Sequence, residues 1–70
     1  MKKLTAQKTL NCIIDLLTYY LEQLQEVKSD GEQFKYGEKT AYIECLELIQ
    51  LWDKADENGL DFNIEERFPL

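Results

Sequence analysis

The chain of 70 residues carries 14 acidic and 8 basic side chains, which leaves a formal charge of −6, and it contains no histidine. An acidic chain without a basic cluster repels phosphate backbones, so we do not expect nucleic acid as a partner. Histidine is the most frequent acid-base group near neutral pH and the commonest metal ligand, so we expect no enzyme, no cofactor and no metal site.

The amino-terminal residues and the two cysteines both predict a cytoplasmic protein. Lys2 and Lys3 are followed by no apolar run of signal-peptide length, and no segment of the sequence is apolar over the length of a membrane span. Cys12 and Cys45 lie within or beside apolar helical stripes, where a thiol packs as a small hydrophobic group. We therefore expect two buried, reduced thiols rather than a disulfide.

The first predicted element is an amphipathic helix over about residues 4–29. Apolar residues recur at spacings of three and four, which is the signature of one helical face. They are Leu10, Ile13, Ile14, Leu17, Tyr20, Leu21, Leu24 and Val27. Thr5 is placed to cap the helix. The sequence Ser29-Asp30-Gly31 predicts a turn, in which Gly31 can adopt the left-handed conformation.

The second predicted element is a helix over about residues 33–58, which Gly59 terminates. Its main apolar face is predicted to hold Phe34, Ala41, Cys45, Leu48, Ile49, Trp52 and Ala55. Within this face Gly37, Ala41 and Cys45 form a ridge of small side chains four residues apart, which lets another helix approach closely. Gly37 lies either inside the helix or in its first turn, and the sequence leaves both positions open.

Residues 59–70 are predicted to fold back over the helical hairpin. Leu60, Phe62, Ile64 and Phe68 are too many large apolar side chains for a solvated tail. Asn63 followed by Glu66 is typical of a short capped helical turn, and Pro69 ends it. The whole chain is therefore predicted to be one all-α domain, an antiparallel two-helix hairpin with a short fold-back segment.

Both predicted helices carry apolar arcs wider than one partner helix can cover, which predicts self-association. The hairpins are expected to dimerise into a four-helix bundle with coiled-coil packing, because twofold dimers are the commonest closed assembly. The candidate interface residues flank the main stripes and are Leu16, Tyr19, Tyr42, Leu46 and Leu51. In the alternative interpretation, these residues are ordinary exposed apolar groups and the tail does all of the covering.

Two groups of side chains could suggest chemistry, and a structural interpretation is favoured for each. The carboxylates of Glu44, Glu47, Asp53, Asp56 and Glu57 fit a solvated helix face better than a metal site. The tyrosines Tyr19, Tyr20, Tyr36 and Tyr42 could stack on bases, but no basic groove accompanies them. Packing or a protein interface is the better interpretation of these rings.

The segments 34–52, 59–65 and 67–70 resemble a group of small uncharacterised helical-hairpin proteins of gut Firmicutes and their mobile elements. They read Phe-Lys-Tyr-Gly-Glu-Lys-Thr-Ala-Tyr-Ile-Glu-Cys-Leu-Glu-Leu-Ile-Gln-Leu-Trp, Gly-Leu-Asp-Phe-Asn-Ile-Glu and Arg-Phe-Pro-Leu. The resemblance covers roughly half of the chain. It implies a bacterial or phage setting, in which small acidic helical proteins are often interaction modules, including inhibitors of host defence. It implies no activity and no catalytic residues.

The leading hypothesis is a small acidic interaction protein that acts as a homo-oligomer and has no catalysis of its own. Its predicted partner is a second copy of the chain, with a host protein as a further partner. One alternative is a small-molecule sequestrant that uses the aromatic and cysteine-lined groove between protomers. Another is a phage or mobile-element inhibitor of a host protein.

Overall fold

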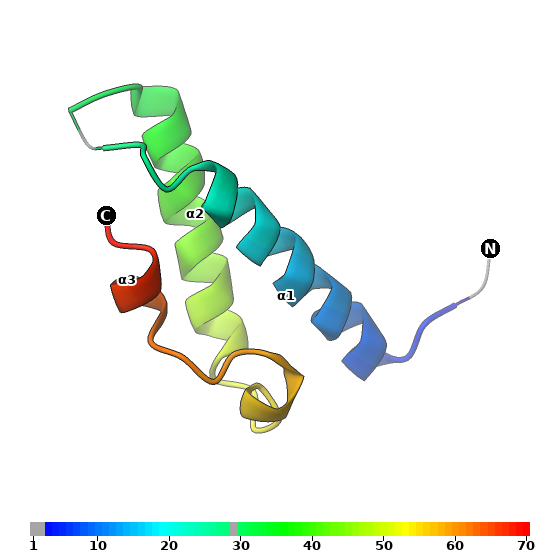
Figure 1. The fold of residues 1–70 in the computed structure, drawn as a ribbon. Helices are drawn as coiled ribbons and strands as arrows, with labels where there is room; N and C mark the ends of the chain where they lie inside the picture. Colours follow the sequence, from blue (N-terminus) through cyan, green and yellow to red (C-terminus); the bar gives the residue numbers. More distant parts are fainter. Residues whose placement is uncertain (1–2, 29) are drawn as a thin grey trace.

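Two long helices form an antiparallel hairpin, and the carboxyl-terminal segment returns along one side of it (Figure 1). The structure is a computed structural model, and it describes residues 3–28 and 30–70. Helix α1 spans Ala6–Gln23 and helix α2 spans Gln33–Ile49, followed by the 3-10 helix η1 at Asp56–Asn58 and the short helix α3 at Ile64–Arg67. The predicted all-helical hairpin is confirmed. Among the described helices, none combines the length and apolarity needed to cross a membrane.

Both ends of α1 are set by polar contacts. At the start, the Thr5 hydroxyl accepts a hydrogen bond from the backbone amide of Lys8 at 3.2 Å, so the predicted cap is confirmed. At the other end, the helix stops at Gln23 rather than at residue 29, and tighter turns lead the chain to Val27. Of the predicted turn, Ser29 lies outside the described residues. Gly31 does not adopt the left-handed conformation that the sequence suggested for it.

Lys39 of α2 is buried in the core with its charge satisfied by three backbone carbonyls. Its side chain is 1% exposed. The ammonium donates to the carbonyl oxygens of Gln25 and Val27 at 3.3 Å each, and to that of Pro69 at 2.9 Å. These three acceptors match the three donors of a lysine ammonium. One side chain thus ties α2 both to the turn after α1 and to the carboxyl-terminal segment.

The buried face of α2 differs from the predicted one. Ile43 and Leu46 join Lys39 in the core, whereas Phe34 is 80% exposed and Leu48 is 69% exposed. The predicted main face is therefore wrong for Phe34, Ala41, Cys45 and Leu48, whereas Ala55 is buried and Ile49 and Trp52 pack partly against the core. The error follows from Lys39, because a charged residue at a core position makes the true inward face look less apolar than the outward one.

The ridge of small residues on α2 faces solvent. Ala41 and Cys45 are exposed, and a Cβ atom added to Gly37 would meet no atom within 4 Å. Gly37 lies inside the helix, beyond its first turn. Cys12 is also exposed, and both thiols are free. The cysteines are therefore unpaired as predicted, but the prediction that they are buried is wrong.

Helix α2 ends at Ile49 instead of continuing to residue 58. The side-chain amide of Gln50 donates to the carbonyls of Leu60 at 3.2 Å and Phe62 at 2.9 Å, which holds the returning chain against the end of the helix. Between them the chain runs through turns and η1. Gly59 then adopts φ 103°, the left-handed conformation expected of a terminating glycine.

The carboxyl-terminal segment supplies a large share of the core, as predicted. The buried apolar residues are Ile14, Leu21, Ile43, Leu46, Ala55, Leu60, Ile64 and Phe68. Trp52 packs against this cluster only in part, from the turn after α2 rather than from the helix face assigned to it. The Asn63 side chain accepts a hydrogen bond from the amide of Glu66 at 3.1 Å, which confirms the predicted cap of the short helix.

Arg67 fastens α3 to the rest of the molecule. Its guanidinium lies 4.7 Å from the centre of the Phe62 ring and 5.2 Å from that of Phe68. The same group forms an ion pair with Glu22 of α1 at 3.0 Å. The polar side of α1 that carries Glu22 therefore faces the carboxyl-terminal segment.

A cluster of side-chain amides lies at the end of the hairpin where α1 begins, opposite the end at which Lys39 contacts the turn after α1. The buried Asn58 donates to the carbonyl of Lys54 at 2.7 Å. Its side-chain oxygen accepts hydrogen bonds from Asn11 at 2.6 Å and Gln7 at 3.4 Å. These contacts connect the first turns of α1 to η1.

Candidate functional site

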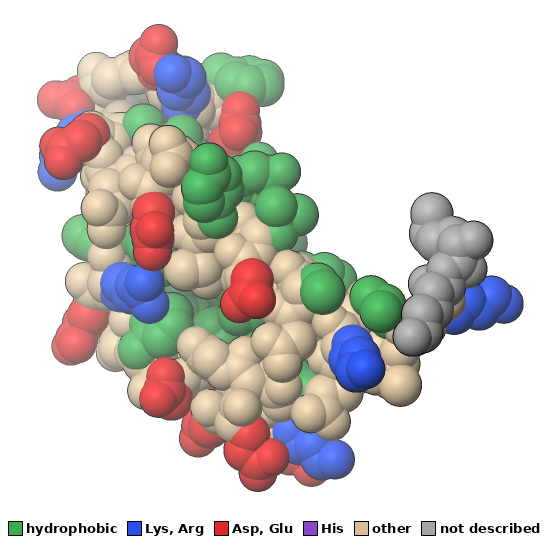
Figure 2. Space-filling model, turned by 45° about the vertical axis from the view of Figure 1, so that its right-hand side comes forward, with side chains coloured by type: hydrophobic (Ala, Val, Ile, Leu, Met, Phe, Trp, Pro, Cys, Tyr) green, Lys and Arg blue, Asp and Glu red, His purple; other side chains and the backbone are tan. Residues whose placement is uncertain are grey.

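The side of the α1–α2 pair that the carboxyl-terminal segment does not cover is apolar and exposed, and we call it the open face. Figure 2 shows hydrophobic side chains gathered toward the upper right of the molecule, bordered by charged groups. The open face consists of Ile13, Leu16, Tyr19 and Tyr20 from α1, Phe34, Ala41, Tyr42, Cys45 and Leu48 from α2, and Leu51 from the following turn. Contiguous exposed apolar surface of this kind marks an interaction site more often than a solvated face.

Four of the five predicted interface residues belong to the open face. Leu16, Tyr19 and Leu51 are 50%, 57% and 82% exposed, and Tyr42 is half-buried between the two long helices. Leu46 is 0% exposed and fills the core. The prediction that Leu46 lies at the interface is therefore wrong, because the sequence pattern pointed to a different inward face of α2.

Six open-face residues were assigned to the inward apolar faces by the sequence, namely Ile13, Tyr20, Phe34, Ala41, Cys45 and Leu48. Tyr20, Phe34 and Leu48 fall on the stripes of three-and-four spacing, so periodicity alone places them inward. The signal that could have identified Phe34 and Leu48 is the ridge of small residues between them. A ridge of that kind suits contact with another helix, whichever way it faces.

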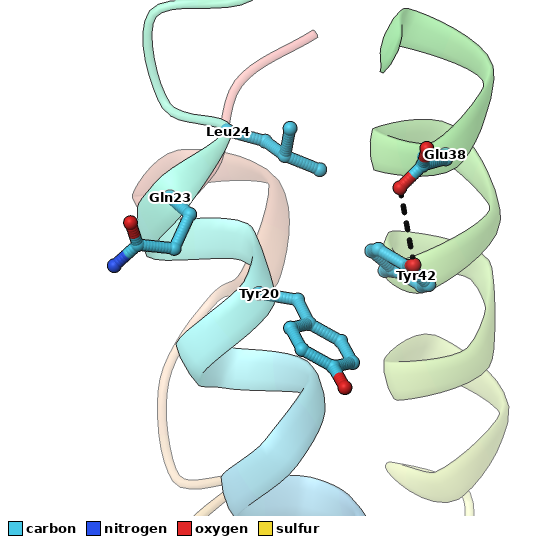
Figure 3. A pocket seen from close by; sticks show the side chains of 5 residues that line it. All are labelled: Tyr20, Gln23, Leu24, Glu38 and Tyr42. Atoms are coloured by element: carbon cyan, nitrogen blue, oxygen red, sulfur yellow. Dashed lines mark hydrogen bonds between the residues drawn. The ribbon is translucent and has the colours of Figure 1, made fainter. Parts of the chain in front are cut away.

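A small pocket opens on this face between the two long helices (Figure 3). It has a volume of about 190 Å³ and is lined by Tyr20, Gln23 and Leu24 from α1 and its end, and by Glu38 and Tyr42 from α2. The Tyr20 and Tyr42 rings reach toward each other, whereas the amide of Gln23 points away from α2. Pockets that bind small molecules usually enclose about 300 to 1,000 Å³, so this one suits a single side chain better.

The tyrosines of the pocket are held by ring contacts and one hydrogen bond. The Tyr20 and Tyr42 ring centres lie 5.5 Å apart, and Tyr19 adds a second ring contact to Tyr20 at 6.1 Å. The Tyr42 hydroxyl donates to a carboxylate oxygen of Glu38 at 3.2 Å. Burial raises the pKa of Tyr42 above 10.0, and the Glu38 charge, its hydrogen bond and Tyr20 raise it further. The phenol therefore stays protonated near neutral pH.

The raised pKa of Tyr42 leads to an expected dependence of stability on alkaline pH. Above about pH 10 the phenol ionises in the unfolded chain while it keeps its proton in the folded one, so the unfolded state binds fewer protons. The contribution of Tyr42 is therefore fully present below pH 10 and falls as pH rises beyond it. Denaturant unfolding of wild type and Tyr42→Phe at several alkaline pH values measures this. The two curves should converge with rising pH, and parallel curves would contradict the assignment.

The five carboxylates that could suggest a metal site all lie at the surface. Glu44, Glu47, Asp53, Asp56 and Glu57 are all exposed, in agreement with the predicted solvated face. Within residues 3–28 and 30–70, no three Cys, Asp or Glu side chains come together in a geometry that could hold a metal ion. The open face has exposed apolar surface and a small pocket, and both features are suited to binding another molecule.

Comparison with known proteins adds no relative to this picture. No family model matches the sequence, and neither the curated proteins nor the solved structures gave a significant match.

Proposed function

We propose that the protein is a small interaction protein that acts as a homo-oligomer. In this proposal the open face closes against a second copy, and the two hairpins form a four-helix bundle. The observation that carries the proposal is the exposure of large apolar side chains on both long helices, on the side away from the carboxyl-terminal segment. The protein then acts through the assembled surface rather than by catalysis.

The area of the open face approaches what a stable dimer requires. Interfaces of standard size take about 800 Å² from each partner, against a total accessible surface of 5253 Å² for this chain. The exposed fractions of the large open-face residues correspond to roughly 600 Å² of apolar surface, with about 200 Å² for a full aromatic and about 100 Å² for an aliphatic side chain. The half-buried Tyr42, the small residues and the polar rim add to this.

The pocket supports protein binding over small-molecule binding. At about 190 Å³ it is smaller than most ligand sites, and it opens onto the apolar surface instead of enclosing a ligand. A side chain from the docked copy can fill it. Such an anchor in a pocket is a common feature of protein interfaces.

Light scattering after size exclusion tests the proposal over a range of protein concentrations. We expect a mass of twice 8.3 kDa at micromolar concentration and dissociation on dilution. The variant Leu48→Glu should weaken the dimer by at least about tenfold, because burying an unpaired charge costs more than about 1.4 kcal/mol. Leu48 is largely exposed, so the monomer should keep its fold.

Lys8→Glu serves as the matched control. Lys8 is exposed, and it lies on the polar strip of α1 that also carries Glu22, the partner of Arg67. This change alters the net charge by more than Leu48→Glu does, so a general charge effect would show more strongly in it. We expect its dimer to remain intact. A wild-type mass of 8.3 kDa at all concentrations would rule out the homo-oligomer and leave the open face to a different protein.

A further inference from the structure

The outer side of α2 carries an uncharged stripe that is symmetric along the chain. We call it the α2 stripe, and it consists of Phe34, Gly37, Ala41, Cys45 and Leu48. The steps between these residues are three, four, four and three, so the pattern is the same in both directions from Ala41. Residue size follows the same symmetry, with large side chains at the two ends and small ones between.

An isologous twofold interface has the property that residue i contacts j while j contacts i. A helix that pairs with its own copy in antiparallel orientation therefore requires contacting positions that are arranged symmetrically about the axis, and a stripe symmetric about one central residue provides this. A parallel pair needs no such symmetry, because every residue then meets its own copy. The α2 stripe meets the requirement of the antiparallel arrangement.

We propose that α2 packs antiparallel against α2 of a second copy, with the twofold axis at Ala41. Gly37 then lies opposite Cys45 of the second copy, and Phe34 lies opposite Leu48. This inference rests on the proposed self-association and specifies its seam. It also explains why a glycine occupies the interior of a helix, at a cost of about 1 kcal/mol relative to alanine.

The dimensions of α2 fit such a seam. Its 17 residues make a rod of about 25 Å, long enough to bring both ends of the stripe into contact. Small residues at the centre allow the helix axes to approach to about 8 Å, the lower end of the usual range. Phe34 and Leu48, which are 80% and 69% exposed in the single chain, then cover each other on both sides of the axis. In the antiparallel orientation the positive end of each helix dipole also lies beside the negative end of the other, which is favourable.

Disulfide cross-linking distinguishes the two orientations. In a Cys12→Ser background, Gly37→Cys brings a thiol opposite the native Cys45 of the second copy. Mild oxidation with glutathione disulfide should convert this variant to a covalent dimer of twice 8.3 kDa on a non-reducing gel. Within one chain, positions 37 and 45 are about 12 Å apart along the helix. That separation exceeds the roughly 7 Å Cα separation that a disulfide tolerates.

The parent Cys12→Ser is the matched control. Its two Cys45 thiols are offset by the same distance of about 12 Å in an antiparallel pair, so it should stay uncross-linked under identical oxidation. A second variant, Ala41→Cys with Cys12→Ser and Cys45→Ser, places the new thiols on the axis and should cross-link to itself. Both substituted positions are exposed in the single chain, and circular dichroism would verify that each variant is folded.

Each pattern of products decides between defined alternatives. Cross-linking through position 37 and through position 41, with none in the parent, supports the antiparallel seam. Rapid cross-linking of the parent through Cys45 would show a parallel seam and overturn the inference. A dimer by light scattering with no cross-link in any variant would place the seam elsewhere on the open face. A monomeric wild type would refute the proposed function together with the seam.

Discussion

Replacing Lys39 with alanine is expected to lower the free energy of unfolding by about 2 to 5 kcal/mol, the range for truncating a long buried side chain to alanine. The change removes three charge-assisted hydrogen bonds, to Gln25, Val27 and Pro69, and leaves their carbonyls without a donor. A domain of this size has about 4 to 10 kcal/mol of stability in total. Urea denaturation should therefore show a protein that is largely unfolded or close to it.

Two controls separate the charge of Lys39 from its packing. Lys39→Met keeps most of the side-chain length but donates no hydrogen bond, so the difference from Lys39→Ala measures the packing alone. Lys35→Ala removes an exposed lysine one turn earlier, whose ion pair with Glu32 is on the surface and contributes at most about 1 kcal/mol. Equal losses for Lys35→Ala and Lys39→Ala would show that the three carbonyl contacts contribute nothing.

The contribution of Lys39 to the free energy of unfolding also depends on pH. Burial lowers the pKa of Lys39 below 10.5, Lys28 lowers it further, and Glu26 opposes the change. Between the lowered value and 10.5 the unfolded chain binds more protons than the folded one, so this group makes stability rise with pH in that window. Its effect is opposite in sign to that of Tyr42. Comparing Lys39→Met with wild type isolates it.

Replacing Phe68 with alanine is expected to cost about 3 to 5 kcal/mol, the range for removing a fully buried phenylalanine. Phe68 is completely buried, and its ring meets that of Phe62 at 6.4 Å and the guanidinium of Arg67 at 5.2 Å. The loss also frees the carboxyl-terminal segment from α1 and α2. Thermal unfolding followed by circular dichroism should show a large drop in melting temperature.

Phe34→Ala makes the same substitution at an exposed position and is therefore the matched control for Phe68→Ala. Phe34 is largely exposed on α2, so at concentrations where the protein is monomeric the change should cost less than about 0.5 kcal/mol. At high concentration it should weaken the dimer instead. Equal destabilisation of the dilute protein by both changes would mean that the carboxyl-terminal segment does not belong to the core.

The hairpin and its fold-back segment could be predicted because their signals are local. The caps at Thr5 and Asn63 act within a few residues, and both are present where the sequence placed them. Gly59 adopts the left-handed conformation expected of a terminating glycine, but it ends η1 and not α2. The density of large apolar residues after Gly59 also has one simple explanation, which is burial. Local chemistry and composition decide these features without knowledge of the partner elements.

The inward face of α2 could not be predicted, because half of it is polar. Lys39 and Gln50 lie on the same side as Ile43 and Leu46, and both find partners far away in the sequence. Without those partners, a lysine and a glutamine are assigned to solvent, and the helix turns its more apolar side inward. The candidate site was affected in the same way, since Phe34 and Leu48 moved from the predicted core to the open face.

The ends of the long helices depend on the same distant contacts. Beyond Gln23, the carbonyls of Gln25 and Val27 accept hydrogen bonds from Lys39. Beyond Ile49, the side chain of Gln50 holds the carbonyl groups of the returning chain. Neither stretch contains a glycine or proline that would stop a helix, so propensity predicts continuation and tertiary contacts override it.

Two polar clusters lie at opposite ends of the hairpin, one around Lys39 and one around Asn58. Together they determine the register in which α1 packs against α2. Leucine and isoleucine side chains tolerate a slide of one helix past another by one turn, about 5.4 Å, with little loss of apolar contact. The same slide would separate the Lys39 ammonium from the carbonyls of Gln25 and Val27 at one end, and the Asn58 side-chain oxygen from Asn11 and Gln7 at the other. The polar ends thus exclude neighbouring registers, and a core of few side chains is left with a single alignment.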